Sequence, residues 1–254
     1  MTADEYLQSL ITKYRSSTGQ GSPAYNAGNA IYPIIQQWAG QQLREAYFSG
    51  SNAKGTAIHG TTDVDLFISL KSDTQKTLKE LFGLLFTKMV QSGYASARKQ
   101  NVSIHVVHNG MDVDLVPAVH LGGNSEDHWL YVNKPNRERT KTNVSTHVEF
   151  VRNSGRGNEI ILTKIWRKNN NLDFPSFYLE LAVIEALKYK RSGLADHFLS
   201  VLDYFSNGFL SAQFVDPANT NNIISNDLTD AEKKTIGAQA SQSRRQQAWE
   251  SIVW

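Results

Sequence analysis

The chain has 254 residues, of which 40% are hydrophobic and 20% charged, and its formal net charge of +2 gives no overall signal for nucleic-acid binding. The absence of cysteine excludes disulfides, thiolate metal sites and a cysteine nucleophile. No apolar stretch approaches the roughly 18–20 residues that a membrane-spanning helix needs. The N-terminal residues also lack a signal-peptide pattern, so we expect a soluble protein of the cytoplasm with no membrane partner.

The first half of the chain mixes helical and strand patterns. Residues 3–16 and 24–44 carry apolar side chains at helical spacing, and a short strand then leads to the turn Gly50-Ser51. Residues 63–70, DVDLFISL, alternate at first and then become apolar, which predicts a strand buried on one face.

A helix and a β-hairpin follow. Residues 73–92 form an amphipathic helical pattern, and residues 101–108 and 111–117 have the composition of strands. Asn109-Gly110 between these strands is a favoured two-residue hairpin turn. The first half is therefore expected to be a mixed, twisted sheet flanked by helices.

The character of the chain changes after about residue 133. Residues 134–158 are polar and basic, and we interpret the stretch 133–143 as a solvated connection, with binding of an acceptor strand or pyrophosphate as the alternative. Beyond it the pattern is mainly helical, over residues 158–169, 175–191, 195–206 and about 229–251, with a loop at 215–226. We expect an α+β fold of two lobes, residues 1–137 with the sheet and residues 138–254 with the helices, and a ligand cleft between them.

Two carboxylates at alternate positions are the most informative feature of the sequence. Because side chains at i and i+2 of a strand point to the same face, Asp63 and Asp65 project together. Neighbouring carboxylates repel each other, and a fold that keeps both usually places a cation between them. Hard oxygen ligands suit Mg²⁺ or Mn²⁺. A third acid from the strand MDVDLVP, Asp112 or Asp114, would complete a site for two metal ions.

The turn Gly50-Ser51 indicates a second half of the same site. A turn of small residues at the start of a helix directs backbone N–H groups outward, where they bind phosphate, and Lys54 lies one helical turn further on. Taken alone, an acid-x-acid pair is usually a solvated strand edge or a turn, and a Gly-Ser pair does not indicate a site. Here the two elements lie 12 residues apart with a third acid downstream, which favours the functional interpretation.

Residues 50–70, GSNAKGTAIHGTTDVDLFISL, resemble the signature of the DNA polymerase β-like nucleotidyltransferase superfamily. That signature is a Gly-Ser turn, a helix, an acid-x-acid strand and a third acid on a neighbouring strand. Within the superfamily, GTAI…TDVDLFISL is most similar to the cGAS/DncV-like nucleotidyltransferases (CD-NTases) and the oligoadenylate synthases, and archaeal-type CCA-adding enzymes are near relatives. The resemblance covers most of residues 48–223.

The resemblance implies specific roles in the first half of the chain. The third acid of these families commonly stands three residues before a proline, which selects Asp114, before Pro117, with Asp112 as the second choice. Asp114 would also act as the base toward the attacking hydroxyl. The implied catalytic ligands of two Mg²⁺ or Mn²⁺ ions are Asp63, Asp65 and Asp114, and the implied phosphate contacts are Gly50, Ser51 and Lys54.

The resemblance continues at residues 161–187, where these families have a triphosphate-binding lysine followed by a serine and an aromatic residue near the nucleotide. Carried over by position, these are Lys164, Ser176 and Tyr178. The alternatives are a solvated helix charge for the lysine, a helix cap for the serine and helix packing for the tyrosine. Residues 215–223, VDPANTNNI, resemble a further loop of the same families.

Metal ligands other than carboxylates are not indicated. None of the seven histidines has a ligand spacing such as HExxH, and His105 and His108 lie three apart on a strand, so they face opposite sides. A His/Cys cluster like the zinc insertion of animal cGAS is also absent from the sequence.

The function that the resemblance implies is synthesis of a cyclic or short linear oligonucleotide from nucleoside triphosphates, for signalling in bacterial anti-phage defence. ATP is the first choice of substrate, followed by GTP, CTP and UTP. The alternative is addition of nucleotides to an RNA 3′ end, as in tRNA, which the shortness of the chain disfavours. A third interpretation, a catalytically silent nucleotide sensor, is disfavoured by the intact acids Asp63, Asp65 and Asp114.

Overall fold

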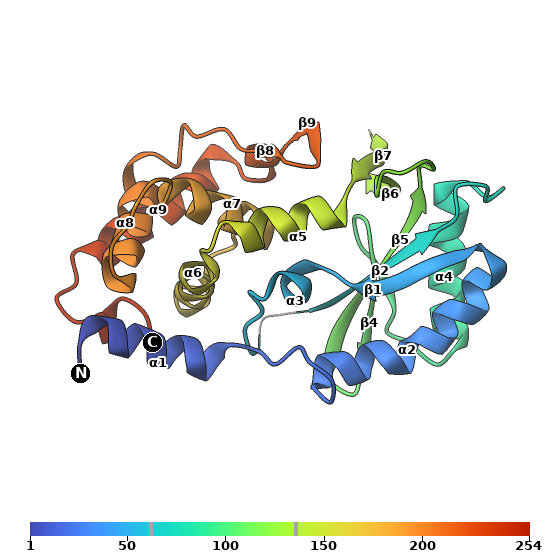
Figure 1. Ribbon diagram of the computed structural model, residues 1–254, viewed down its shortest axis with the longest axis horizontal. Helices are drawn as coiled ribbons and strands as arrows, with labels where there is room; N and C mark the ends of the chain where they lie inside the picture. The colour runs from blue at the N-terminus through green and yellow to red at the C-terminus, as the bar shows by residue number, and fades with distance from the viewer. Residues whose placement is uncertain (61–62, 135–136) are drawn as a thin grey trace. The chain divides into compact units, whose positions relative to one another are not determined.

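The computed structural model describes residues 1–60, 63–134 and 137–254 and divides them into two compact units (Figure 1). The sheet unit comprises Ser17–Gly55 and Thr62–Val148, and the helical unit comprises Met1–Ser16, Thr56–Thr61 and Glu149–Trp254. Each unit is therefore assembled from separate stretches of the chain. Our assignment of catalytic and nucleotide-binding tasks to residues 1–137 and 138–254 stays a prediction.

The described strands of the sheet unit form one mixed sheet, which confirms the α+β class. The order is β1–β2–β5–β4–β3, and β6 joins β5 and pairs in turn with β7. The β2–β5 pair is parallel and the other pairs are antiparallel. The strands are β1 Leu43–Phe48, β2 Val64–Leu70, β3 Arg98–Lys99, β4 Ile104–His108, β5 Met111–His120, β6 His128–Lys134 and β7 Arg137–Thr142.

Two helices cover one face of this sheet. Helix α2 (Pro23–Ala39) begins with the cap Ser22, and helix α4 (Leu78–Gln91) begins with a capping box between Thr77 and Glu80. The expected start of α4 at residue 73 was five residues too early because the cap fixes the first turn. The shared core contains Ile31 and Ile35 of α2, Phe82 and Leu85 of α4, Leu66 and Ile68 of β2, and Val113 and Leu115 of β5.

Alternation along the strands leaves the odd-numbered residues of β2 and β4 and the even-numbered residues of β5 on the opposite face of the sheet. Asp65, His105 and Asp114 all belong to that set. The sequence pattern of apolar residues therefore determines which face of the sheet carries the candidate site residues.

The hairpin predicted at Asn109-Gly110 is confirmed. Both residues have positive φ, 50° and 77°, as a type I′ turn requires, and the strands pair directly outside them. We did not predict β6 and β7, and β5 runs three residues beyond its expected end. Most of the stretch 133–143 therefore belongs to a β-hairpin, although residues 135 and 136 and the side chain of residue 137 lie outside the described part.

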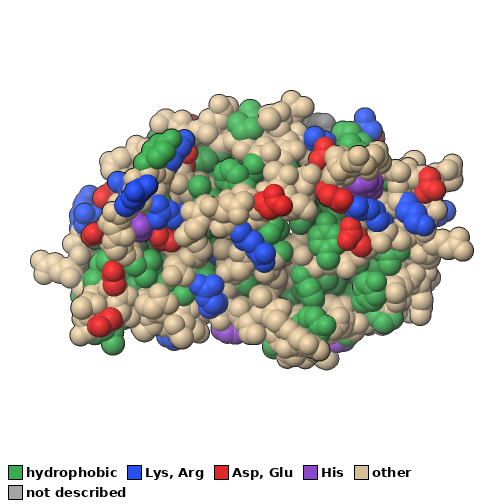
Figure 2. Space-filling model, viewed as in Figure 1, with side chains coloured by type: hydrophobic (Ala, Val, Ile, Leu, Met, Phe, Trp, Pro, Cys, Tyr) green, Lys and Arg blue, Asp and Glu red, His purple; other side chains and the backbone are tan. Residues whose placement is uncertain are grey.

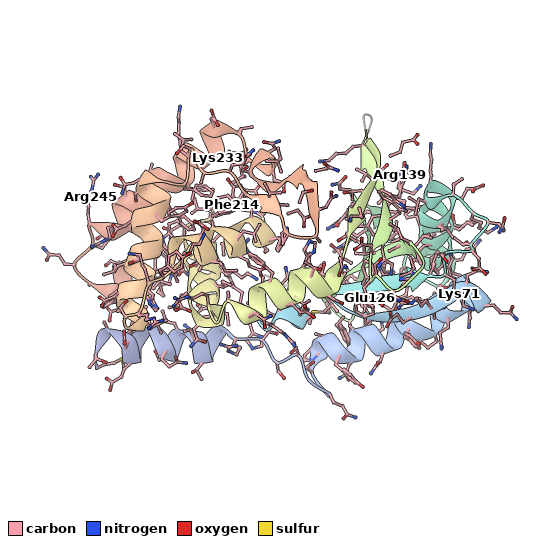
Figure 3. All side chains as sticks on the ribbon, turned by 45° about the horizontal axis from the view of Figure 1, so that its top comes forward. Lys71, Glu126, Arg139, Phe214, Lys233 and Arg245 are labelled. Carbon is pink, nitrogen blue, oxygen red and sulfur yellow. The ribbon has the colours of Figure 1, made fainter. Side chains whose placement is uncertain are left out.

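Helices dominate the other unit, as expected. Its core gathers aromatic side chains, including Trp166, Phe174, Phe205 and Phe209. Phe214 joins them and is labelled in Figure 3. The α-helices and strands of this unit are α1 Ala3–Tyr14, α6 Gly157–Asn169, α7 Ser176–Ala186, α8 Leu194–Asn207, α9 Asp230–Arg244, β8 Val215–Asp216 and β9 Asn219–Ile223. Helix α3 Gly50–Lys54 belongs to the sheet unit, and α5 Val144–Asn153 has residues in both units. The last helix thus ends seven residues before its expected end.

Charges of both signs are interspersed on the face drawn in Figure 2, in keeping with the net charge of +2. In the ranges that the structure describes, no helix combines the length and the apolar character that crossing a bilayer requires.

Candidate active site

The central parallel pair of strands brings acids from distant parts of the sequence together. In the β2–β5 register Asp65 lies beside Asp114, and Asp63 precedes β2 by one residue. Ligand atoms of Asp63, His105 and Asp114 all lie within 4.8 Å of one another. Three side chains that could bind a metal therefore meet at one end of the sheet, and one of them is a histidine.

A continuous row of polar side chains crosses the sheet at this level. The strand registers place Asp65 beside Asp114, Asp114 beside His105, and His105 beside Arg98. Residues paired in register project from the same face. The row thus changes from acidic on β2 and β5 to basic on β4 and β3.

The turn that precedes α3 lies against the acid pair. Gly50 has φ 54°, and a Cβ atom built on it would lie 1.8 Å from Oδ2 of Asp65. The backbone N–H of Ser49 also donates to the carbonyl oxygen of Asp65, at 2.8 Å. Glycine is therefore required twice at position 50, by its backbone angle and by the approach of the carboxylate.

Helix α3 links the turn to the acids. Asn52 is buried within it, and its Nδ2 donates to the carbonyl oxygen of Asp63 at 3.4 Å. Ser51 and Lys54 are half-buried in the same helix, which ends at Gly55 in the left-handed conformation. The predicted phosphate contacts of Gly50, Ser51 and Lys54 stay predictions.

Repulsion and burial both act on the carboxylates. Burial raises the pKa of Asp114, and the hydrogen bond from His105 is the largest of the effects that lower it. The pKa of Asp63 is also raised, first by loss of solvation and then by the negative charges of Asp114 and Asp112. Asp63 nevertheless keeps an exposed surface. A nearby cation stabilises the ionised form of such carboxylates, and their hard oxygen atoms suit Mg²⁺ or Mn²⁺ as ligands.

His105 is the site residue that we did not predict. Its spacing from His108 gives no ligand pattern, and only the pairing of β4 with β5 reveals its place. It is 1% exposed, with Nδ1 3.1 Å from Oδ1 of Asp114 and Nε2 3.0 Å from Oδ1 of Asp112. The hairpin turn, which we did predict, was the signal that could have found it.

Comparison with known families identifies the family to which the chain belongs. The family model for the Second Messenger Oligonucleotide or Dinucleotide Synthetase domain matches residues 1–154, which is more than half of the chain. The chain belongs to this synthetase family. The match includes Asp63, Asp65 and Asp114, and the resemblance to CD-NTases is confirmed.

Two curated relatives represent the two branches that we expected. The CCA-adding enzyme of Methanosarcina barkeri is 27% identical over 156 residues, covering 56% of this chain and 32% of that enzyme. The cyclic AMP-AMP-AMP synthase of Escherichia coli MS 115-1 is 24% identical over 163 residues, covering 57% of this chain and 50% of that synthase. The matches thus span half or less of both relatives.

The fold of the synthetase family extends over nearly the whole chain. The structure of E. coli MS115-1 CdnC with ATP has a TM-score of 0.76 and 17% sequence identity, and covers 99% of this chain and 95% of that one. At this identity the likeness establishes the fold alone. The α+β architecture is therefore shared well beyond residue 154, where the family model ends.

The lysine predicted to contact the triphosphate lies inside the helical unit. Lys164 on α6 is 2% exposed, and its Nζ lies 2.8 Å from Oε1 of Glu180 on α7. The same ammonium donates to the carbonyl oxygen and to Oγ1 of Thr56, at 3.2 and 3.1 Å. A triphosphate contact would require Lys164 to leave these partners, and that role stays a prediction.

The two other predicted nucleotide contacts lie on α7. Tyr178 is fully buried among Phe174, Phe209 and Phe214, and burial raises the pKa of its phenol. Ser176 begins the helix and accepts a hydrogen bond from Arg167 at 3.1 Å. Base stacking by Tyr178 would need this core to open, so its role and that of Ser176 stay predictions.

Proposed function

We propose that this chain is a metal-dependent nucleotidyltransferase that joins nucleoside triphosphates into a cyclic or short linear oligonucleotide and releases pyrophosphate. The observation that carries the proposal is the pair of aspartates on adjacent parallel strands, Asp65 beside Asp114, with Asp63 at the same end of the sheet. Membership of the synthetase family supports this chemistry over other uses of an acidic cluster.

Asp63, Asp65 and Asp114 would hold two Mg²⁺ or Mn²⁺ ions. These ions would neutralise the triphosphate and polarise the α-phosphate. The acceptor hydroxyl attacks the α-phosphorus in line, the bond to the β-phosphate oxygen breaks, and pyrophosphate leaves. Asp114 takes the proton of that hydroxyl, and Gly50, Ser51 and Lys54 orient the phosphates. The protein thus acts mainly by positioning and charge neutralisation.

ATP is the first substrate that we propose, with GTP, CTP and UTP as further candidates. This order is supported by the name of the cyclic AMP-AMP-AMP synthase of E. coli MS 115-1 and by the structure of CdnC from the same strain, which was solved with ATP. We extend the proposal to a signalling role in bacterial anti-phage defence and to a cytoplasmic location, on the resemblance to CD-NTases. The alternative, addition of nucleotides to an RNA 3′ end, draws on the match to the CCA-adding enzyme of M. barkeri.

Labelled triphosphates separate these functions. The protein is incubated with ATP, GTP, CTP and UTP and with Mg²⁺ or Mn²⁺, with and without tRNA, and pyrophosphate is measured alongside labelled products. A phosphatase-resistant small product formed without RNA is the expected result. Label found only on tRNA would establish the alternative. If no condition releases pyrophosphate, the enzyme proposal is wrong, and binding of triphosphate without that release would make the chain a silent nucleotide sensor.

A further inference from the structure

The buried imidazole of His105 lies between two acids of one strand. Nδ1 is 3.1 Å from Oδ1 of Asp114, and the geometry is that of a hydrogen bond. Nε2 is 3.0 Å from Oδ1 of Asp112, but it has no aligned hydrogen-bond acceptor among the described residues. The contact with Asp114 is therefore the directional one, whereas the approach of Nε2 to Asp112 lacks the alignment of a hydrogen bond.

The direction of the hydrogen bond follows from the chemistry of the two groups. An ionised carboxylate only accepts, so Nδ1 carries the proton and donates it to Asp114. This bond occupies one carboxylate oxygen and restrains the orientation of the group. Ser103 also contributes a side-chain hydrogen bond that lowers the pKa of Asp114. The side chain of Asp114 is 15% exposed and that of Asp112 is 51% exposed, so the histidine restrains the more buried acid.

The imidazole is itself held in place. It projects from β4, which pairs with β3 on one side and with β5 on the other, and it is 1% exposed. A ring in this position has little freedom to rotate, so its Nδ1 is a fixed point for the carboxylate. Partners of metal-binding carboxylates that have this geometry typically change metal affinity about 10–100-fold when they are removed.

We propose that His105 is a positioning residue that orients Asp114 for the divalent cation. This inference rests on the proposed function, because it assumes that Asp114 binds a metal. It assigns His105 no contact with the metal, the nucleotide or the reacting atoms. The Nδ1–H group acts through Asp114 alone.

Two amide substitutions distinguish the role of Nδ1 from that of Nε2. In His105→Asn the side-chain amide nitrogen occupies the place of Nδ1, whereas in His105→Gln it occupies the place of Nε2. His105→Leu removes both donors and retains an apolar side chain of similar size. Affinity for Mn²⁺ is measured for each protein by the electron paramagnetic resonance signal of free Mn²⁺, with circular dichroism and melting temperature as controls of the fold.

We expect His105→Leu and His105→Gln to weaken Mn²⁺ binding about 10–100-fold. His105→Asn should retain most of the wild-type affinity. Activity should follow the same order at low Mn²⁺ and recover in the Leu and Gln variants at high Mn²⁺, with a smaller change in the KM for ATP. A packing role would instead give losses that extra metal does not restore.

Four results would overturn the proposal. Equal Mn²⁺ affinity in all variants would show that His105 does not act on the metal site. An Asn variant as weak as the Leu variant would exclude the Nδ1 hydrogen bond as the cause, and the Asn–Gln comparison remains valid if the Leu variant fails to fold. Nitrogen hyperfine coupling of a directly bound imidazole in the Mn²⁺ spectrum would make His105 a ligand. A wild-type protein that binds no Mn²⁺ would overturn the proposed function together with this inference.

Discussion

Each unit of the molecule contains a cluster of charged residues, and the two clusters are balanced in different ways. On the sheet, Asp63 and Asp114 lie close together and the pKa of each carboxyl group is raised. In the helical unit, the ammonium of Lys164 meets the carboxylate of Glu180 at 2.8 Å, and both side chains are almost fully buried. The first cluster retains an excess of negative charge, and the second is neutral as a pair. An excess of like charge that the fold maintains indicates a ligand, whereas a neutral buried pair is explained by the fold itself.

The largest effect that we expect is the loss of turnover in Asp65→Asn. The amide keeps the shape of the side chain beside Gly50 but removes the charge that a divalent cation needs. Metal stabilisation of the transition state is worth several kcal/mol, and about 1.4 kcal/mol corresponds to a tenfold change, so kcat should fall on the order of 10³-fold or more. Pyrophosphate release measures the loss.

The control for this substitution is Asp73→Asn, because Asp73 is exposed and lies outside the candidate site. Both variants should melt at the wild-type temperature, and only the first should lose activity. Full activity of Asp65→Asn would refute the assignment of the metal ligands.

In the helical unit we expect a substitution to reduce stability, whereas Asp65→Asn on the sheet should reduce activity and leave stability unchanged. Lys164→Met leaves the carboxylate of Glu180 buried without its charged partner, which typically costs about 3–5 kcal/mol of stability. Replacing both residues, with Lys164→Met and Glu180→Leu, should recover much of that loss because neither charge of the buried pair remains. Urea unfolding of the two single variants and the double variant gives the coupling energy. A stable Lys164→Met protein with a strongly raised KM for ATP would instead favour the predicted triphosphate contact.

The next effect concerns the turn against the acids. Gly50→Ala adds a methyl group where a Cβ would lie 1.8 Å from the carboxylate of Asp65, so that carboxylate must move. A displacement of about 1 Å at a catalytic group typically costs about 10²-fold in rate. The matched control is Gly55→Ala, because Gly55 also has positive φ (75°) but has no atom within 4 Å of a Cβ. Both variants should lose stability because alanine disfavours positive φ, and only Gly50→Ala should lose activity. Equal activities would mean that the turn does not fix Asp65.

The arrangement of the acids and the histidine on the sheet could be derived from the sequence, because the hairpin turn fixes the pairing of their strands. A two-residue turn at Asn109-Gly110 fixes which residues of the two strands are opposite each other, and counting outward from it places His105 opposite Asp114. The alternation of apolar residues then selects the face. The acids and the histidine could thus be brought together by local rules.

The remainder depends on contacts that local patterns do not contain. The pairing of β6 with β7 involves RERTKT, a polar segment without apolar alternation, so it has no strand signal of its own. Thr56 meets Lys164 across 108 residues of sequence, and Glu180 lies in a largely apolar helix whose pattern predicts no buried ion pair. Such contacts follow from how helices pack, which helical spacing alone does not specify.

The smallest expected effect tests the buried tyrosine of the helical unit. The hydroxyl group of Tyr178 is buried and has no hydrogen-bond partner among the described residues. Because an unsatisfied buried polar group costs about 1–3 kcal/mol, Tyr178→Phe should leave stability unchanged or raise it, as measured by urea unfolding. Tyr189→Phe is the control, since Tyr189 is 91% exposed and water already solvates its hydroxyl. If Tyr178→Phe instead destabilises the protein or raises the KM for ATP while Tyr189→Phe does neither, the hydroxyl has a partner in the working enzyme. The predicted contact of Tyr178 with the nucleotide would then be supported.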